Sequence, residues 1–545
     1  MNFFGTDGIR GTYGSTLTDS TAYLLGKSLA LVGEDCPIVV VARDTRNSGE
    51  KLFGALASGV YDGGGNVINL GILPTNAVGH FVRKFGGDFG VSLLTGSVSQ
   101  KLSGGYTQSD GGTKNSDFKR RRAYYTGSYT SRYADLVWQA GLSSQDYGAS
   151  TFYSAKFDNQ WEATRRIITS AQADIKPFGD ERFVITPQAY WHRDVDPYQL
   201  TRGKEGAKNG ENYHRTDVYG ASLNAHATWL LGKTAVGMDI RKEHILSTAY
   251  GDLLPENEWK DIHGTDRRYD HRGDRTNTSL FLEHNVILGG FTLSAGVLAN
   301  RNTGLDGDFR FYPGVDLSYR PNEMWKFYAS WNKALRVPTY TDLYTSNSVQ
   351  QGDTGLRPER TSTFKAGTRF RTRGVEAVVS GFYSKGNDII DWVYETEESR
   401  KYHAMNIGKL DNMGYSVDAT LNMTELIPGS FVTRIKAGYA RIHQRHTTEQ
   451  PVYRSLYALE YLRHKATFQL DHRIWSRLSA SWAVRWQERM NHYEPYTKVD
   501  CKLQWTAPTY SLYVKADNIT NHRYYDLGGV RQPGLWIMAG GSVKI

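Results

Sequence analysis

The chain has 545 residues, too many for one small domain, and its net charge is +9 at neutral pH. Its mean hydropathy is −0.53, and no apolar run reaches the roughly 18 residues that a membrane helix needs, so a helical membrane protein is excluded. A membrane β-barrel is allowed, because its strands are apolar on one face only. Aromatic residues make up 13% of the chain, which suits the aromatic girdles of such a barrel, although a soluble aromatic-rich β-protein would also fit.

Three further features limit the possible partners and compartments. Cys36 and Cys501 are far apart and have neither a disulfide pattern nor a metal-ligand spacing. The densest basic run, at 119–122, lies where a loop enters a strand, so we interpret it as a solvated rim and expect no nucleic-acid partner. Residues 1–7 show no charged, apolar or cleavage region of a secretory signal, which conflicts with the export of a barrel.

The first segment, up to about residue 91, alternates between helical and strand periods. This β-α-β-α-β order is typical of a mostly parallel sheet, and it predicts a small three-layer α/β unit. The run at 37–42 is apolar without interruption, as in a strand buried on both faces. The expected helices are Ser20–Val32, Ser48–Tyr61 and Thr75–Phe85, and the expected strands are Pro37–Ala42, Asn66–Leu70 and Asp88–Val91.

Three loops of this segment could carry chemistry. They read FGTDGIRG at 4–11, DTRNSG at 44–49 and PTNA at 74–77. Glycines allow a ligand to approach the backbone closely, and a loop that opens a helix offers N–H groups to an anion. Taken together, in this order, the loops resemble the start of bacterial phosphoglucosamine mutase, of the phosphohexomutase family. The resemblance places four residues near the phosphosugar: Thr6, Arg10, Asp44 and Arg46.

The same resemblance also implies what such an enzyme would need. The family moves a phosphate through a phosphoserine in a T/S-A-S-H-N-P loop, with Mg²⁺ bound by a D-x-D-x-D-R loop. At the serine-loop position this chain reads SLLTGSVS (92–99), and its Asp-Val-Asp at 194–196 is a chance match. Phosphoryl transfer depends on such positioned charges, so we expect no catalytic residues, no Mg²⁺ or other cofactor, and no mutase activity.

The second segment, from about residue 92 to 545, is dominated by alternation with period two. One face is apolar and aromatic and the other is polar, as along 291–300, 325–332 and 431–439. Short turns such as 288–290 and 320–323 alternate with long charged loops such as 249–277 and 337–360. This pattern predicts a large antiparallel transmembrane β-barrel of about 20–22 strands. A soluble propeller is the alternative, but the segment shows no blade-length repeat.

The C-terminal strand fits the same interpretation. Positions 535, 537, 539, 541, 543 and 545 are apolar or small and alternate with the others, as in a final strand that barrel-insertion machinery recognises. Ile545 stands where such strands usually end in Phe. The residues that we assign to this C-terminal signal are Trp536, Ile537, Val543 and Ile545.

Four strings then identify a family. They are LRVPTYTDLY at 335–344, GLRPERTSTF at 355–364, GFYSKGNDIIDW at 381–392, and DNITNHRYYD at 517–526 with Pro533-Gly534 after it. As a set they resemble the TonB-dependent outer-membrane receptors, of the cobalamin-receptor-like and siderophore-receptor-like kind. The resemblance implies an outer-membrane location, contact with outer-membrane lipid and with the TonB complex, and uptake of a small ligand such as cobalamin or an iron chelate.

Several parts of that family are not found in the sequence. The plug and the Ton box are missing, and so, we expect, are the first strand or two, which would leave an unpaired barrel edge. The chain as it stands is therefore not expected to transport. In the family the outer loops contact the ligand, and Tyr, Trp, Arg and His residues of 250–271 are loop candidates, none singled out. His263 and His271 are interpreted as solvated histidines rather than metal ligands.

We therefore expect a chain made of two unrelated parts. Residues 1–91 are a truncated first domain of a phosphohexomutase, and residues 92–545 are a receptor barrel without its plug. A receptor barrel is favoured over an incomplete mutase, because its match is longer and its motifs are present. A natural bifunctional fusion is the third possibility, and we favour a joined-gene or assembly artefact with its junction between Val91 and Thr95.

Overall fold

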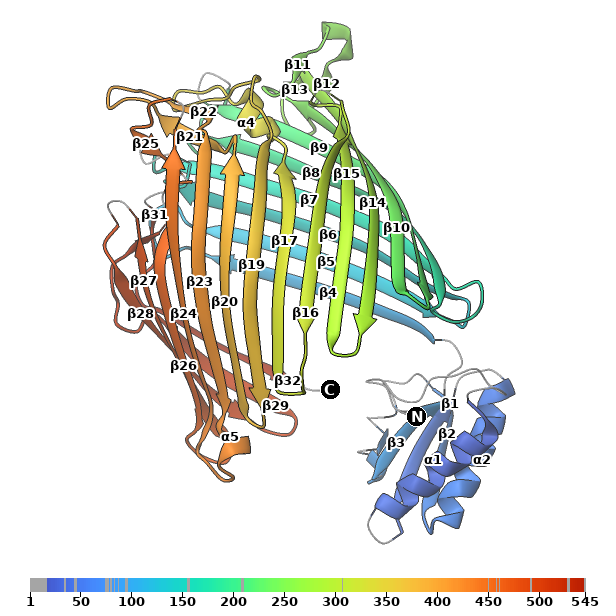
Figure 1. The fold of residues 1–545 in the computed structure, drawn as a ribbon. Coiled ribbons are helices and arrows are strands. Elements are labelled where there is room, and N and C mark those ends of the chain that lie inside the picture. Colours follow the sequence, from blue (N-terminus) through green and yellow to red (C-terminus); the bar gives the residue numbers. More distant parts are fainter. Residues whose placement is uncertain are drawn as a thin grey trace. The chain divides into compact units, whose positions relative to one another are not determined.

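The computed structural model describes residues 17–33, 36–43, 47–73, 78, 81–82, 84–86, 88–93, 97–153, 157–206, 210–305, 307–448, 450–456, 458–459, 461–490, 493–526 and 530–543. These residues form two parts, an α/β unit and a closed barrel, and each is described by itself (Figure 1).

The α/β unit is a parallel sheet with two helices packed on one face, and helical residues Val78 and Val82 lie against Gly90 on the other face. Its strands lie in the order β2 (Asn66–Ile72), β1 (Ile38–Arg43) and β3 (Phe89–Leu93), and its helices are α1 (Asp19–Val32) and α2 (Asn47–Asp62). Val39 and Val41 of β1 pack against both helices, while Val40, on the other face, is also fully buried. The expected helices and strands of this unit are therefore confirmed wherever the residues are described. The helix expected at 75–85 lies partly outside them; residues 78, 81, 82, 84 and 85 are helical.

Local signals explain where α1 begins and how closely α1 and α2 pack. Thr18 caps α1 in a reciprocal arrangement with Thr21, which satisfies backbone donors that the first turn leaves free. The two helices cross at glycines: a Cβ on Gly26 would lie 2.1 Å from the carbonyl oxygen of Leu56, and one on Gly59 would lie 2.0 Å from that of Tyr23. The contact is therefore backbone against backbone.

The second part is a sheet that closes on itself. Twenty long strands and the two-residue β11 (Asp252–Leu253) make up the closed sheet in the described residues, which confirms the expected barrel. Every pairing for which a register is defined is antiparallel. The long strands are β4 (Ser97–Ser109), β5 (Phe118–Thr130), β6 (Ala134–Ser150), β7 (Gln160–Ile175), β8 (Phe183–Gln199), β9 (Glu211–Trp229), β10 (Gly232–Ser247), β14 (His271–Leu288), β15 (Phe291–Asn302), β16 (Arg310–Tyr319), β17 (Trp325–Arg336), β19 (Glu359–Thr372), β20 (Val375–Asn387), β23 (Lys409–Asn422), β24 (Val432–Thr447), β26 (Leu462–Arg473), β27 (Leu478–Arg489), β28 (Tyr496–Thr506), β29 (Tyr510–Asp517) and β32 (Trp536–Val543).

This topology corrects the expectation of an unpaired barrel edge. The last strand, β32, hydrogen-bonds to β29 on one side and to β4 on the other, so the described sheet has no open edge. Closure satisfies the backbone groups of both terminal strands, as a hydrocarbon environment requires. The expectation failed because it assumed a fixed strand number, whereas the sheet closes with the strands that this chain supplies.

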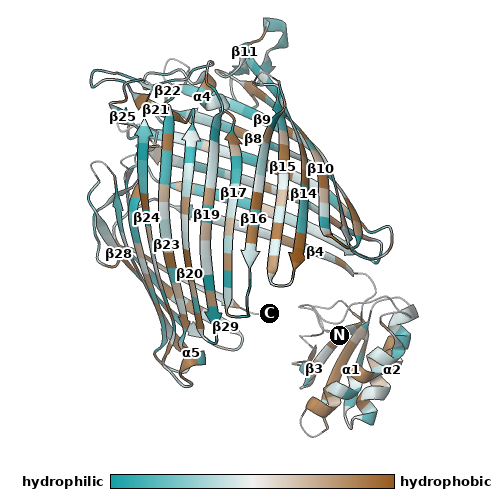
Figure 2. Ribbon diagram, viewed as in Figure 1, coloured by the Kyte–Doolittle hydropathy of each residue, from teal (hydrophilic) through white to brown (hydrophobic). Residues whose placement is uncertain are grey.

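The faces of the wall follow the predicted alternation. Cross-strand pairing aligns Leu293, Leu317, Ala329 and Ala366 in one row over β15, β16, β17 and β19. Figure 2 shows the resulting alternation of hydrophobic and hydrophilic residues along these strands. The apolar rows are exposed, as Leu293 (42%) and Leu317 (44%) illustrate, because they face outward rather than into a core.

The two ends of the barrel differ in their connections. Residues 230–231 and 289–290 are two-residue turns at one end, and that end also holds the short helix α5 (Met423–Leu426). Long loops at the other end carry their own structure, labelled in Figure 1. They contain α4 (Tyr340–Tyr344), the 3-10 turn η2 (Glu256–Glu258) and the short strands β12 (Lys260–Asp261), β13 (Arg268–Tyr269), β18 (Gln350–Gln351), β21 (Ile390–Tyr394), β22 (Tyr402–Asn406), β25 (Arg454–Ser455), β30 (Tyr525–Asp526) and β31 (Val530–Arg531).

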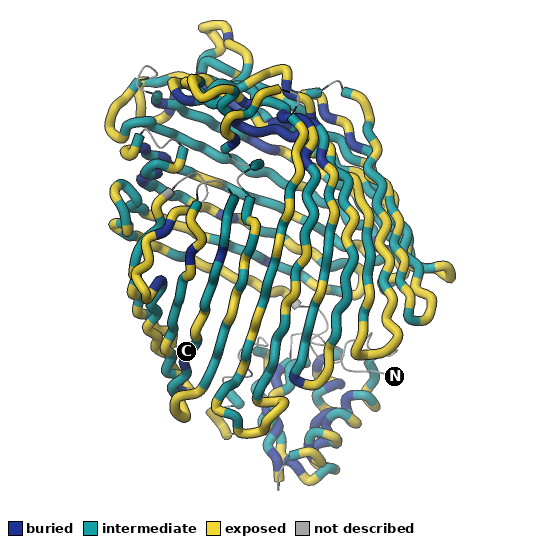
Figure 3. Tube along the Cα trace, turned by 60° about the vertical axis from the view of Figure 1, so that its left-hand side comes forward, coloured by how far each residue is buried: buried dark blue, intermediate teal, exposed yellow. Residues whose placement is uncertain are grey.

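Burial is concentrated away from the wall. Figure 3 shows a wall of mostly half-buried and exposed residues, with buried residues gathered in the α/β unit and among the loops. Three small apolar clusters lie in the loops, for example Leu356, Ile390, Trp392 and Ala404. The loops are therefore packed structures. No helix in the described part of the chain has the length and apolar character needed to cross a membrane.

Candidate ligand-binding site

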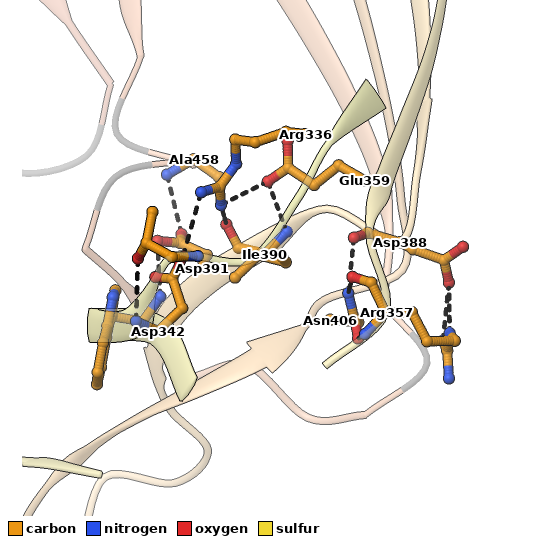
Figure 4. A network of polar contacts seen from close by, with 11 residues as sticks. Arg336, Asp342, Arg357, Glu359, Asp388, Ile390, Asp391, Asn406 and Ala458 are labelled. Carbon is orange, nitrogen blue, oxygen red and sulfur yellow. Dashed lines mark hydrogen bonds and ion pairs between the residues drawn. The ribbon is translucent and has the colours of Figure 1, made fainter. Parts of the chain in front are cut away.

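Two of the motifs that identify the family meet at the base of the long loops. Arg336, the last residue of β17, forms ion pairs with Asp342 of α4 (3.2 Å) and Glu359 of β19 (2.8 Å). Glu359 also accepts a hydrogen bond from the backbone N–H of Ile390 at 2.9 Å. Figure 4 shows one guanidinium joining the wall to the loops. We call Arg336, Asp342, Glu359 and Ile390 the Arg336 network.

A second ionic group lies beside it. Asp388 is nearly buried and pairs with Arg357 (2.8 Å) and Arg360 (2.6 Å). Asn406 donates to the carbonyl oxygens of both Asp388 (2.7 Å) and Arg357 (2.9 Å), as Figure 4 shows. Burial acts to raise the pKa of Asp388, but the hydrogen bonds and charges of Arg360 and Arg357 outweigh it and hold that pKa below its usual range. Asp388 therefore stays ionised and ties the 355–364 motif to the β21–β22 hairpin.

Asp391 fixes a third loop to the same hairpin. Its carboxylate accepts hydrogen bonds from the Ser455 hydroxyl and from the backbone N–H of Ala458 at 2.9 Å. The strands β18, β22, β21 and β25, which come from three loops, consequently form one four-stranded sheet. Beside it lies a hollow of about 350 Å³. The lining includes Asp353, Arg357, Glu395, His403, Met405 and Asn406.

An aromatic group reaches across the loops. Tyr250 stacks on His214 with ring centres 4.1 Å apart, and its hydroxyl lies 2.9 Å from that of Thr345, which follows α4. Burial raises the pKa of Tyr250, so its hydroxyl stays protonated. Nearby, the Arg275 guanidinium lies 4.6 Å from the ring centre of Tyr340, and burial raises the pKa of Tyr340 to about 12. Arg275 is also paired with Glu243 and donates to the Pro338 carbonyl oxygen at 2.8 Å, so this group offers a polar molecule neutral phenols and a positioned guanidinium.

The structure singles out Tyr250 within the 250–271 loop. Trp259 is bound within the loop, where its indole N–H donates to the Leu254 carbonyl at 3.0 Å. His271 lies 2.7 Å from Asp270, while His263 is exposed. In the described residues no three His, Cys, Asp or Glu side chains gather as a metal-binding group.

The fourth motif forms a separate hydrogen-bonded group at the loop end of β28 and β29. Asn518 has a positive φ of 52° and is 1% exposed. Its side-chain amide donates to the carbonyl oxygens of His522 (2.9 Å) and Pro533 (3.3 Å), and its backbone N–H donates to Asp500 at 2.7 Å. This asparagine therefore shapes the loop before β32 rather than binding a ligand.

The sequence-predicted site residues fall into two groups. Thr6, Arg10, Asp44 and Arg46 lie outside the described residues, and Ile545 does too. Trp536, Ile537 and Val543 lie in β32, where Ile537 (64% exposed) and Val543 (72%) share the outward row. Their assignment as an insertion signal stays a prediction.

Sequence reasoning missed a buried polar group on the inner wall. Tyr153 donates to Glu162 at 2.5 Å and stacks edge-on against Tyr198, whose hydroxyl donates to Gln160 at 2.7 Å. Gln160 and Glu162 are both buried. Two polar residues at alternate positions where a long loop enters β7 are the signal that could have identified them.

The comparisons with known proteins divide along the chain. A model of the TonB dependent receptor-like β-barrel family matches residues 64–519, and a model of the phosphoglucomutase/phosphomannomutase α/β/α domain I matches residues 1–117, so the two matches overlap. Phosphoglucosamine mutase from Clostridium tetani is 50% identical over 93 residues, which cover 16% of this chain and 21% of that enzyme. The enzyme from Thermotoga neapolitana is 49% identical over 84 residues, covering 15% and 19%. The chain thus spans about a fifth of the length of these curated relatives.

Solved structures resemble the barrel. The copper transporter OprC superimposes with a TM-score of 0.63 at 15% identity, covering 81% of this chain and 75% of that one. The FrpB iron transporter from Neisseria meningitidis gives 0.63 at 15% identity, covering 82% and 77%. At these identities the likeness shows the fold alone, but the family model covers most of the chain. The chain therefore belongs to the TonB-dependent receptor-like β-barrel family, whose members are outer-membrane proteins, and it carries a mutase-type α/β segment at its start.

Proposed function

We propose that the barrel captures a small metal chelate or cobalamin at its long-loop end, and that the chain as it stands does not transport it. The observation that carries the proposal is the loop assembly itself. The Arg336 network, Asp388 and Asp391 fix three loops into one sheet, and Tyr250 and Arg275 lie beside α4. These contacts hold the described loops in one arrangement, which is what a preformed binding site needs.

The class of ligand is inferred from side-chain chemistry and family. Iron chelates of the siderophore type carry oxygen atoms and often negative charge, which guanidinium groups and neutral phenols can bind. Similar structures include a ferric enterobactin receptor and a ferric citrate transporter, which supports an iron chelate for this chain. Cobalamin, the other candidate, would use the aromatic surface more than the arginines.

The proposal of no transport rests on what directly precedes the first barrel strand. Receptors of this family are opened by TonB acting on a plug domain before the barrel, whereas here β3 of the α/β unit ends at Leu93 and β4 begins at Ser97. We propose the domain limits 1–91 and 92–545 on the same ground. Without a plug and a Ton box in that position, a ligand can bind to the loops, but TonB has no segment there to bind and no plug to move.

Fluorescence titration of the refolded full chain would test ligand capture. The probes are ferric enterobactin, ferric citrate and cyanocobalamin, read by tryptophan quenching. We expect one iron chelate to bind, with the Kd raised on the order of tenfold in Tyr250→Ala, as for loss of a well-packed aromatic contact of about 1.4 kcal/mol. Trp475→Phe, at an exposed short turn, is the control and should bind as wild type. Equal binding by Tyr250→Ala, or no binding of any probe by folded protein, would refute the proposal.

Mutase activity is the second candidate, favoured by the high identity of the α/β segment. The chain after β3 runs into the barrel strand β4, with no serine loop of the mutase type in the sequence between them. We therefore propose that it is catalytically inactive. A coupled assay with glucosamine 6-phosphate and Mg²⁺ should show no turnover, and turnover above a blank would restore the enzyme hypothesis.

A further inference from the structure

The inner and outer faces of β5, β6 and β7 can be told apart by their contacts. Tyr124 donates to Gln139, which donates to Ser170 at 2.8 Å, so these side chains share one face. Arg166 and Asp194 form an ion pair on that face too. Successive side chains of a strand point to opposite sides, so the intervening residues face the other way. That other face carries Leu136, Trp138 and Leu142, which identifies it as the outside of the wall.

Two arginines stand on this outer face beside apolar side chains. On β5, Arg121 is three positions from the inward Tyr124, and on β7, Arg165 directly precedes the inward Arg166, so both arginines point outward. The strand β6 lies between β5 and β7. The two outward arginines line a hollow of about 360 Å³ together with Ala123, Leu142 and Ile167. Arg122, Arg166, Ser143 and Ser144 also border the hollow, but on these strands the side chains of Arg122 and Arg166 point to the inner face. The hollow therefore combines two outward cationic groups with apolar side chains, and we call Arg121, Ala123, Leu142, Arg165 and Ile167 the Arg121 hollow.

The depth of the hollow follows from strand length. Arg121 lies nine positions before Thr130, the end of β5, and Arg165 lies ten positions before Ile175, the end of β7. Both strands end at the end of the barrel that carries the two-residue turns, at the connections 131–133 and 176–182. A tilted strand crosses the hydrocarbon core with about 9–11 residues, so both guanidinium groups lie where the wall leaves the core on the long-loop side. That is the level of the lipid headgroups.

The two charges have no acidic partner there. In the described residues neither Arg121 nor Arg165 forms an ion pair, and Arg121 has only the Tyr106 ring, 5.9 Å from its guanidinium. At the headgroup level, a basic side chain without an acidic partner in the protein is attracted to an anionic lipid by about 1 kcal/mol. Guanidinium groups bind phosphate through two parallel hydrogen bonds. We propose that the Arg121 hollow binds the phosphate headgroup of an outer-leaflet lipid, with an acyl chain over Ala123, Leu142 and Ile167.

This site is distinct from the ligand site in the loops and rests only on the membrane placement of the barrel. Native mass spectrometry of the refolded full chain in detergent tests it, with dioctanoyl phosphatidic acid as the probe. Dioctanoylglycerol, which lacks the phosphate, and inorganic phosphate, which lacks the chains, are the comparison probes. Folding of every variant is confirmed by heat-modifiable gel migration, so loss of lipid and loss of the barrel are separately visible.

We expect wild type to retain phosphatidic acid but not dioctanoylglycerol, and millimolar phosphate not to displace it. R121Q/R165Q should weaken retention on the order of tenfold or more, since each basic residue near an anionic surface contributes about a factor of five. The matched control is R301Q/K333Q, which removes two charges from the outward rows of β15 and β17 at similar depth and should change retention less than twofold. Leu142→Gln should also weaken retention.

Three results would overturn the proposal. Equal retention by R121Q/R165Q would show that the arginines do not hold the lipid. An equal loss in R301Q/K333Q would reduce the effect to general surface charge. Displacement by inorganic phosphate alone would show an anion site without a lipid.

Discussion

Replacing Gly59 by alanine should unfold the α/β unit at a lower temperature, although alanine is the better helix former. The new Cβ would lie 2.0 Å from the carbonyl oxygen of Tyr23 and 2.9 Å from the backbone nitrogen of Lys27. Both atoms belong to the backbone of α1, so no side chain can rotate away, and the helices must separate. Overpacking of this kind costs about 1–3 kcal/mol, and the helix propensity of alanine returns at most about 1 kcal/mol.

Gly54, in the same helix, provides the matched control. A Cβ there meets nothing within 4 Å, so Gly54→Ala gains the propensity without a clash. For a unit of this size about 1 kcal/mol moves Tm by roughly 4–8 °C. We expect Gly59→Ala to lower the Tm of the helical signal by about 5–15 °C and Gly54→Ala to raise it by a few degrees.

Circular dichroism at 222 nm reads this transition, because α1 and α2 hold most of the helix in the described residues. The barrel should melt separately, and its transition should be the same in all three proteins. A Gly59→Ala protein that melts at or above the wild-type temperature would show that the helices do not cross with backbone contact, and the account of the α/β core would fail.

Three further predictions concern the barrel and the gene. Because the folded-state pKa of Asp388 is lowered, its contribution is present above the unfolded value of about 4 and is lost as the pH falls through the folded pKa. Proteolysis of the 388–408 loop in the wild type should therefore be slow at pH 7 and become faster only below about pH 4. The loop of Asp388→Asn should be cut quickly both at pH 7 and below pH 4. A wild-type proteolysis rate that stays constant down to pH 3 contradicts this. Val297→Lys places a charge on the outward face and should cost about 2–4 kcal/mol in bilayer folding titrations, while Leu298→Lys, on the opposite face, should cost much less; equal costs would show that the faces are misassigned. If the two parts were joined artificially, single DNA reads from the source across codons 80–110 should never run through Val91 and Ser92, and one continuous read would make the fusion a real gene.

Local features of the fold were predictable from the sequence. Period two along 291–300 is a property of neighbouring residues, and it gave the outward row of β15 before any partner strand was known. The capped start of α1 and the unbroken apolar run of β1 are equally local. Strand closure was not predictable in this way, because the pairing of β32 with β4 joins residues more than 400 positions apart. No local pattern records how many strands a sheet needs to close.

The binding surface was predictable as a set of motifs but not as a geometry. The sequence singled out 335–344, 355–364 and 381–392, and the structure joins them through Arg336, Glu359 and Asp388. Which of several arginines would pair with which carboxylate could not be read from the strings. Tyr250 was one candidate among many until its contact with Thr345, 95 positions away, set it apart.

The two parts of the chain bury their apolar residues by incompatible rules. In β1 the residues Val39, Val40 and Val41 are all fully buried, as a parallel strand covered on both faces requires. In β15 the outward residues Leu293 and Val297 remain 42% and 37% exposed, because lipid rather than protein must cover them. One part therefore completes its core in water and the other only in a membrane. This difference is a physical reason, independent of any motif, to treat the two parts as separate folding units.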